Sequence, residues 1–226
     1  SGAAAFNGAG SVTLNGTSGT YVNLGGGLLN GLTSATFAGW FSYDQSVNNV
    51  HLFSFDDGIG HGSENGGAWN GSYLRYNLYD TGNGNNGVSF VEIPNKGNPN
   101  GGKLSGTGVL APNTPTYVAF TYDVANGVQS LYVNGALQSS SSGALAALNT
   151  IFNTRGTLGV SPWDAWGDPY LKGSIDQFSI YDGALSGAPI ATDFAAGPAP
   201  VPEPSSVALG LTGLGLISYL RRRNGR

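Results

Sequence analysis

The chain has 226 residues, of which only 10% are charged, and its formal net charge is −4. Residues 1–200 carry five Lys and Arg against twelve Asp and Glu, a net charge of −7, which argues against a nucleic-acid or anionic-membrane surface. Cysteine is absent, which excludes disulfides, zinc–thiolate centres and cysteine nucleophiles.

The N-terminus has the composition of a processed end. Methionine is absent, the initiator included, and Ala3, Ala4 and Ala5 match the small residues at the end of a signal-peptidase site. We therefore expect that an export signal has been removed and that residues 1–5 are what remains of the processing region. The roughly 190 residues that follow suit one large all-β domain.

Short alternating patterns dominate the first half of the chain. With 38 glycines and 11% aromatic residues, we interpret the glycines as turn residues between the strands of a packed core. Strands are predicted near residues 12–14, 22–24, 36–43, 51–55, 73–79 and 88–93. In 36–43, Phe37 and Phe41 fall on one face and Trp40 on the other, which is typical of a central strand.

An acidic, glycine-rich loop is predicted from residue 56 to residue 71. It could form a metal or sugar site, or it could simply be a solvated loop, and the second interpretation is the commoner outcome. The loop residues in question are Asp56, Asp57 and His61, with Glu64 nearby. Only one other histidine exists, His51, so a multi-histidine metal centre is excluded.

The second half begins with a predicted β-meander over residues 116–140. Its strands alternate in hydrophobicity, and Asn126-Gly127 and Asn134-Gly135 are turn sequences. A late strand is predicted at 173–181, and residues 185–194 are expected to form a short helix or an irregular segment that covers a sheet edge. About eleven strands without βαβ alternation predict a two-sheet antiparallel sandwich.

Two tryptophans, Trp163 and Trp166, are predicted to lie on one loop beside Asp164 and Asp168. Exposed indole rings could stack on sugars while the carboxylates accept hydrogen bonds from hydroxyls. Alternatively, the rings could cap the hydrophobic core. Trp69, beside the acidic loop, allows the same two interpretations.

Three segments resemble the laminin-G-like, concanavalin A-like domains: 117–123 with 131–135, and 171–181 with Ala184-Leu185-Ser186. The resemblance covers roughly residues 6–193. It implies an all-β, two-sheet antiparallel jelly-roll sandwich over 6–196, often with one calcium ion at the rim and with carbohydrate or protein ligands.

Asp176 shares strand parity with Phe178 and Ile180, so its carboxylate is expected to point with core residues and to need partners. A Ca²⁺ ion with backbone carbonyls would satisfy it, as in similar domains, and so would backbone N–H donors or an arginine at the sheet end.

Catalysis is disfavoured by the acidic residues available. Glycoside hydrolysis needs two carboxyl groups about 5 to 10 Å apart. None of the three glutamates, Glu64, Glu92 and Glu203, has an acidic partner two or four positions away, and Asp56 and Asp57 would point to opposite strand faces. No G-x-S-x-G sequence is present either. We therefore expect no enzyme, with a glucanase-like carbohydrate-active enzyme as the alternative.

The C-terminus combines three chemically distinct parts. A proline-rich linker, 197–204, is followed by an apolar segment and an arginine cluster within residues 205–226. A helix over 205–220 would be about 24 Å long, shorter than the ~30 Å hydrocarbon core, so it would be a weak anchor. The prolines favour an extended, accessible motif. The motif is Val201, Pro202, Glu203 and Pro204, and the cytoplasmic stop is Arg221, Arg222 and Arg223.

This arrangement resembles the PEP-CTERM sorting signal of Gram-negative bacteria. The resemblance implies transient insertion into the inner membrane, processing by an exosortase, and a final place at the cell surface or in an exopolysaccharide or biofilm matrix. The sequence as a whole therefore predicts an exported protein that binds glycan or protein ligands, or that serves structurally in the matrix.

Overall fold

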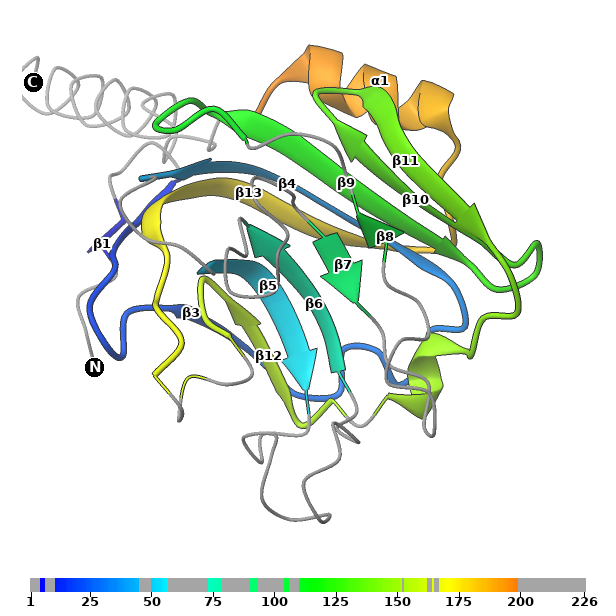
Figure 1. Cartoon of the computed structure of the whole chain (residues 1–226), viewed down its shortest axis with the longest axis horizontal. Coiled ribbons are helices and arrows are strands. Elements are labelled where there is room, and N and C mark those ends of the chain that lie inside the picture. Colours follow the sequence, from blue (N-terminus) through cyan, green and yellow to red (C-terminus); the bar gives the residue numbers. More distant parts are fainter. Residues whose placement is uncertain are drawn as a thin grey trace, which may run out of the picture.

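The chain folds into two antiparallel β-sheets packed face to face (Figure 1). A computed structural model describes residues 11–44, 50–56, 110–151, 153–161, 164 and 167–198, and the backbone of residues 5–6, 73–78, 90–92 and 104–105. One sheet has seven strands, in the order β1 (Ala5–Phe6), β2 (Val12–Asn15), β13 (Lys172–Asp182), β4 (Ala35–Tyr43), β9 (Thr116–Asp123), β10 (Val128–Val133) and β11 (Ala136–Ser142). The other has six, in the order β3 (Val22–Gly25), β12 (Arg155–Leu158), β5 (Val50–Asp56), β6 (Tyr73–Leu78), β7 (Phe90–Glu92) and β8 (Leu104–Ser105).

The predicted two-sheet antiparallel sandwich is thus confirmed, together with the meander β9–β10–β11. Strands far apart in sequence pair at the sheet centre, where β4 lies between β13 and β9. The chain also crosses from one sheet to the other, as between β4 and β5 and between β12 and β13, and these crossovers make the jelly-roll arrangement. The strand β12 is absent from the sequence-based prediction, and it fills the place between β3 and β5.

The core between the sheets is built on aromatic rings. Phe37 on β4 is fully buried, and its ring centroid lies 5.6 Å from that of Phe53, 5.4 Å from that of Phe55 and 6.3 Å from that of Phe120. These residues follow the period of two expected for strands, so one face of each strand supplies the core. As predicted, β4 is buried on both faces.

The helix α1 (Gly187–Ala196) covers the outer face of the seven-stranded sheet (Figure 1). Its Ile190 and Phe194 form a second cluster with Trp40 on β4 and Tyr117 on β9. The expectation that this segment covers a sheet edge is therefore wrong. The apolar outer residues of the central strands need a cover more than the edge does, because an exposed Trp40 would leave a large apolar surface in water.

A short 3₁₀ helix, η1 (Leu148–Thr150), follows β11. Among the described residues, no helix is long and apolar enough to cross a membrane. The tail motif, the apolar segment and the arginine cluster lie outside the described residues.

The turn between β10 and β11 requires left-handed backbone at both central residues. Asn134 has φ 49° and Gly135 has φ 76°. This is the geometry of the two-residue hairpin turn that Asn-Gly favours, and the Asn134 side chain accepts a hydrogen bond from the Tyr117 N–H at 3.0 Å. The turn between β10 and β11 is therefore also tied to β9.

Gly135→Ala is expected to lower the free energy of unfolding by about 2–3 kcal/mol, more than Gly25→Ala, for which we expect about 1 kcal/mol. Both positions are left-handed, with φ 76° and 81°. A Cβ at Gly135 would lie 3.0 Å from Phe194 Cδ1 and 3.3 Å from Ala191 Cα, whereas a Cβ at Gly25 meets nothing within 4 Å. Urea unfolding measures both, and equal losses would contradict a close approach of α1 to this turn.

Candidate functional site

Asp56 ends β5 in a buried ion pair. Its side chain is 1% exposed, and Oδ1 lies 2.9 Å from Arg155 Nε on the neighbouring strand β12. Ser54 Oγ donates to Asp56 Oδ2 at 2.9 Å. Asp56 is therefore part of a sheet and not of a solvated loop, and the expectation that placed it in the loop 56–71 is corrected.

The guanidinium of Arg155 ties β5 and β12 to the segment that follows β12. Nη1 donates to both carboxylate oxygens of Asp164, at 3.2 and 3.3 Å, and Nη2 donates to the Ser161 carbonyl at 3.2 Å. Burial opposes the charge, but Asp56 and Asp164 outweigh it and raise the pKa of Arg155, which stays protonated. Sequence spacing does not indicate this pair, because Arg155 is 99 positions from Asp56.

The carboxylates expected to meet sugar hydroxyls have protein partners. Asp164 accepts from Arg155 and Asp168 accepts from Ser161 Oγ. The structure thus brings Asp56 and Asp164 together through one arginine. Among the other residues predicted for ligand binding, Asp57, His61, Trp163 and Trp166 lie outside the described residues.

Asp176 lies where the pairing of β13 with β4 changes register. Ile175 pairs with Phe41 and Gln177 with Trp40, so Asp176 is an extra residue in a β-bulge. Ile175 and Phe178, three positions apart, both pack in the core. The strict alternation that placed Asp176 with Phe178 therefore does not hold across this point, and Asp176 is only half-buried.

Calcium at Asp176 stays a prediction. Among the described residues, no group of three or more His, Cys, Asp or Glu side chains is arranged to hold a metal ion. A Ca²⁺ ion at Asp176 would therefore depend largely on carbonyl oxygens.

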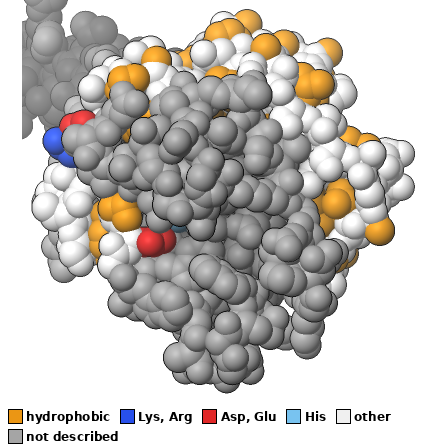
Figure 2. Space-filling model, viewed as in Figure 1, with side chains coloured by type: hydrophobic (Ala, Val, Ile, Leu, Met, Phe, Trp, Pro, Cys, Tyr) orange, Lys and Arg blue, Asp and Glu red, His pale blue; other side chains and the backbone are white. Residues whose placement is uncertain are grey.

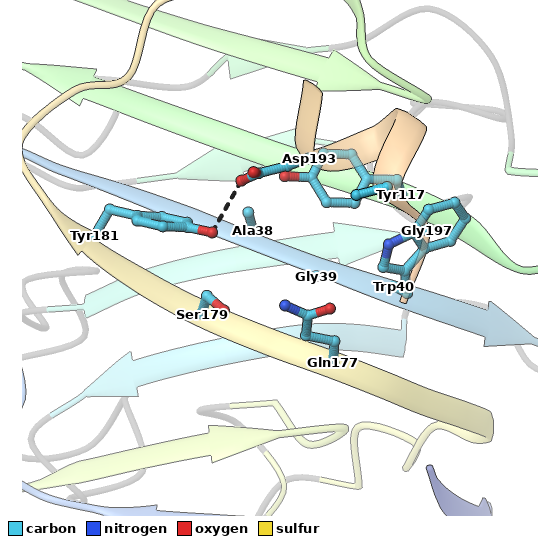
Figure 3. A pocket seen from close by; sticks show the side chains of 10 residues that line it. Ala38, Gly39, Trp40, Tyr117, Gln177, Ser179, Tyr181, Asp193 and Gly197 are labelled. Carbon is cyan, nitrogen blue, oxygen red and sulfur yellow. Dashed lines mark hydrogen bonds between the residues drawn. The ribbon is translucent and has the colours of Figure 1, made fainter. Parts of the chain in front are cut away.

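A half-open groove lies on the outer face of the seven-stranded sheet, beside α1 (Figure 3). Its volume is about 280 Å³. Four elements line it, and the sequence-based prediction missed it. The described lining residues are Ala38, Gly39 and Trp40 on β4, Tyr117 on β9, Gln177, Ser179 and Tyr181 on β13, and Asp193, Ala196 and Gly197 in and after α1.

The β-bulge sets the face that β13 presents to this groove. Beyond the bulge, Gln177, Ser179 and Tyr181 alternate with the core residues Phe178 and Ile180. Polar side chains therefore stand along the outer face while apolar ones point inward. This alternation of polar and apolar residues is visible in the sequence, and it could have indicated a polar outer face on β13.

Asp193 forms the charged part of the groove. Tyr181 donates to Asp193 Oδ2 at 2.9 Å, and Tyr117 lines the same groove. Figure 3 shows Asp193 reaching from α1 over the groove, with Gln177 and Ser179 pointing in from the opposite side. The pKa of Tyr117 and of Tyr181 is raised, first by burial and then by Asp193, so both phenols remain neutral donors at neutral pH.

Stability is expected to fall as the pH rises above about 10. Burial raises the pKa of Tyr122 to about 12. A raised folded-state pKa stabilises the protein below the unfolded pKa, and this contribution is lost as the pH rises through the folded pKa. Urea unfolding between pH 9 and 12 should show this fall, with a smaller slope in Tyr122→Phe; an unchanged slope would contradict it.

The fold and the groove can now be compared with known proteins. A family model described as the concanavalin A-like lectin/glucanases superfamily matches residues 15–191. The chain belongs to this superfamily. A second model, the PEP-CTERM protein-sorting motif, matches residues 200–224, so the chain also carries that motif. No curated protein sequence matches the chain.

Several solved structures share the fold of this chain. The IT-sialidase CBM40 of Ruminococcus gnavus, bound to α2,3-sialyllactose, is 16% identical with a TM-score of 0.66, over 81% of this chain and 96% of that one. Domain 4 of the GH43 extracellular arabinanase AbnA of Geobacillus stearothermophilus, in complex with arabinotriose, is 21% identical with a TM-score of 0.57, over 82% and 76%. The NanB sialidase of Streptococcus pneumoniae is 22% identical with a TM-score of 0.64, over 81% of this chain but 27% of that one.

The chain thus spans about a quarter of the NanB sialidase. Figure 2 shows few charged side chains among the coloured residues of this face, which agrees with the low share of charged residues in the chain, 10%. Both cations whose side chains the structure describes are paired, Arg155 with Asp56 and Asp164, and Lys172 with Asp44 at 2.7 Å. Neither belongs to the lining of the groove.

Proposed function

We propose that the protein is exported, is sorted by its C-terminal motif, and binds glycans outside the cell through the groove beside α1. The observation that carries this proposal is the composition of the groove. It combines the half-buried ring of Tyr181 with an amide, hydroxyls and one carboxylate, on the sheet face of a concanavalin A-like sandwich. Aromatic rings contact the apolar faces of sugars, and the polar groups bind their hydroxyls.

Two of the similar structures support a sugar ligand. One is a CBM40 bound to α2,3-sialyllactose, and the other is domain 4 of an arabinanase in complex with arabinotriose. Because the identities are 16% and 21%, they support the kind of ligand and leave the site to be argued from this chain.

The number and burial of the carboxylates favour glycan binding over glycan hydrolysis. Asp193 is the one carboxylate among the described residues that line the groove, whereas glycoside hydrolysis uses two. Asp56, the candidate for a glucanase-like alternative, is held by Arg155 and is 1% exposed. A buried carboxylate that is fixed in an ion pair is poorly placed to attack or protonate a glycosidic bond.

Sorting is the second part of the proposal. The match to the PEP-CTERM motif over residues 200–224 supports an exosortase as partner, with transient insertion in the inner membrane and release to the cell surface or an exopolysaccharide matrix. Mass spectrometry of the secreted protein should show that the C-terminal residues have been removed. A secreted form that retains Arg226 would contradict processing.

Glycan binding is tested with the full chain, purified in mild detergent, on an array of bacterial and plant glycans. Retention on a defined set of glycans without release of reducing ends is the expected result. Release of reducing ends would favour the glucanase-like alternative. Failure to retain any glycan would contradict the proposal and leave a purely structural role in the matrix.

A further inference from the structure

We propose that the groove beside α1 selects non-acidic sugar residues and rejects acidic ones, and that Asp193 sets this selectivity. The proposal rests on the proposed glycan binding and adds the class of sugar. It follows from the charge of the groove, from the hydrogen-bonding capacity of Asp193 and from the size of the space.

The charge of the groove is negative. Asp193 is the ionisable carboxylate of the described lining, and no Lys or Arg side chain is among the described residues that line the groove. The cations Arg155 and Lys172 are held in ion pairs elsewhere. A uronic or sialic acid would therefore bring its carboxylate toward another carboxylate with no cation between them, and like charges in a partly desolvated site repel strongly.

Asp193 has acceptor capacity left for a ligand. An ionised carboxylate offers about four lone-pair sites, and the hydroxyl of Tyr181 occupies one of them. The remaining sites accept hydrogen bonds from donors, which are the hydroxyl groups of a neutral sugar or the ammonium group of an amino sugar. A sugar carboxylate has no hydrogen to donate at neutral pH.

The opposite side of the groove suits hydroxyl groups as well. Gln177 and Ser179 are half-buried and point into the space from β13, across from Asp193 (Figure 3). An amide both donates and accepts, and so does a hydroxyl. Sugar hydroxyls, which do the same, can therefore be satisfied on both sides.

The volume limits the ligand to a small unit. About 280 Å³ is slightly smaller than typical ligand pockets, which span roughly 300–1,000 Å³. The groove therefore accommodates one or two sugar residues, such as the end or a side branch of a polysaccharide. This inferred preference differs from the acidic sialyllactose named for one similar structure.

The experiment compares three tetrasaccharides with the same β-1,4 backbone: cellotetraose, the tetramer of glucosamine, and the tetramer of glucuronic acid. Titration calorimetry on the full chain in detergent, at pH 7 and low salt, gives each Kd. We expect the glucuronic acid tetramer to bind at least tenfold more weakly than cellotetraose, and the glucosamine tetramer at least as tightly. In Asp193→Asn the acidic and neutral tetramers should bind within about threefold of each other.

Asp182→Asn is the matched control, because Asp182 is an exposed carboxylate at the end of β13, next to Tyr181, and does not line the groove. It should leave the discrimination unchanged. Raising the salt concentration for the unmodified chain should also reduce the discrimination, which tests the charge effect without any substitution. Each variant is first checked for an unchanged melting temperature.

The inference is overturned if the acidic tetramer binds as well as cellotetraose at low salt, or if Asp182→Asn and Asp193→Asn act alike. It is also overturned if no tetramer binds and Asp193→Asn leaves the affinity for the glycans retained on the array unchanged. Glycan binding would then take place at another site. If neither the array nor the tetramers show binding, the proposed function fails and this inference fails with it.

Discussion

Replacing Arg155 with methionine is expected to lower the free energy of unfolding by about 3 kcal/mol or more. The substitution leaves the Asp56 carboxylate, 1% exposed, without its charged partner. It also removes the donors to Asp164 and to the Ser161 carbonyl, which connect β12 to the segment after it. An unpaired buried charge is among the most destabilising groups a protein can contain, so this single change should be one of the largest.

A matched control is Lys172→Met, which breaks the exposed pair with Asp44. Lys172 is 50% exposed and Asp44 28% exposed, so we expect at most about 1 kcal/mol. The double variant Asp56→Leu/Arg155→Met should recover part of the lost stability, because an apolar pair replaces both charges. If Arg155→Met costs no more than Lys172→Met, Asp56 does not depend on this arginine.

Phe37→Ala is expected to lower the free energy of unfolding by about 3–5 kcal/mol. The ring of Phe37 is fully buried at the centre of the sandwich and lies within 6.3 Å of three other phenylalanine rings, centroid to centroid. Its removal leaves a cavity between the two sheets that rigid strands cannot fill, and the aromatic contacts are lost as well. Chemical denaturation of the full chain in detergent measures the loss.

The control is Leu137→Ala on the edge strand β11, whose side chain is 56% exposed. A change within about 0.5 kcal/mol is expected there. A loss at Phe37 no larger than the loss at Leu137 would contradict the placement of Phe37 in the inter-sheet core.

The strands were predictable where their residues alternate clearly. Residues 36–43, 116–123 and 173–181 combine dense apolar alternation with glycine or asparagine turns, and each forms a strand. The strand Arg155–Leu158 was not predictable in this way, because only Leu158 in it is a large apolar residue. Its neighbours β3 and β5 hold it in place by main-chain pairing, which leaves no mark on local hydrophobicity.

The sites were harder to predict than the strands. The groove assembles residues from β4, β9, β13 and α1, and their proximity depends on the sheet order and on the bulge at Asp176. Neither the sheet order nor the bulge can be read from the spacing of residues in the sequence. Likewise, the position of Asp56 after a hydrophobic strand suggested a loop, whereas its role follows from a partner 99 residues later.

The central claim is that the groove beside α1 binds glycan. The most direct test is the affinity of the glycan that the array retains best, measured by titration calorimetry on the unmodified chain and on Gln177→Ala/Ser179→Ala. Both side chains are half-buried and point into the groove, so losing their hydrogen bonds should weaken binding about tenfold. The control Ser139→Ala/Ser141→Ala on β11 should bind as the unmodified chain does. An unchanged Kd in the Gln177→Ala/Ser179→Ala variant would contradict the claim.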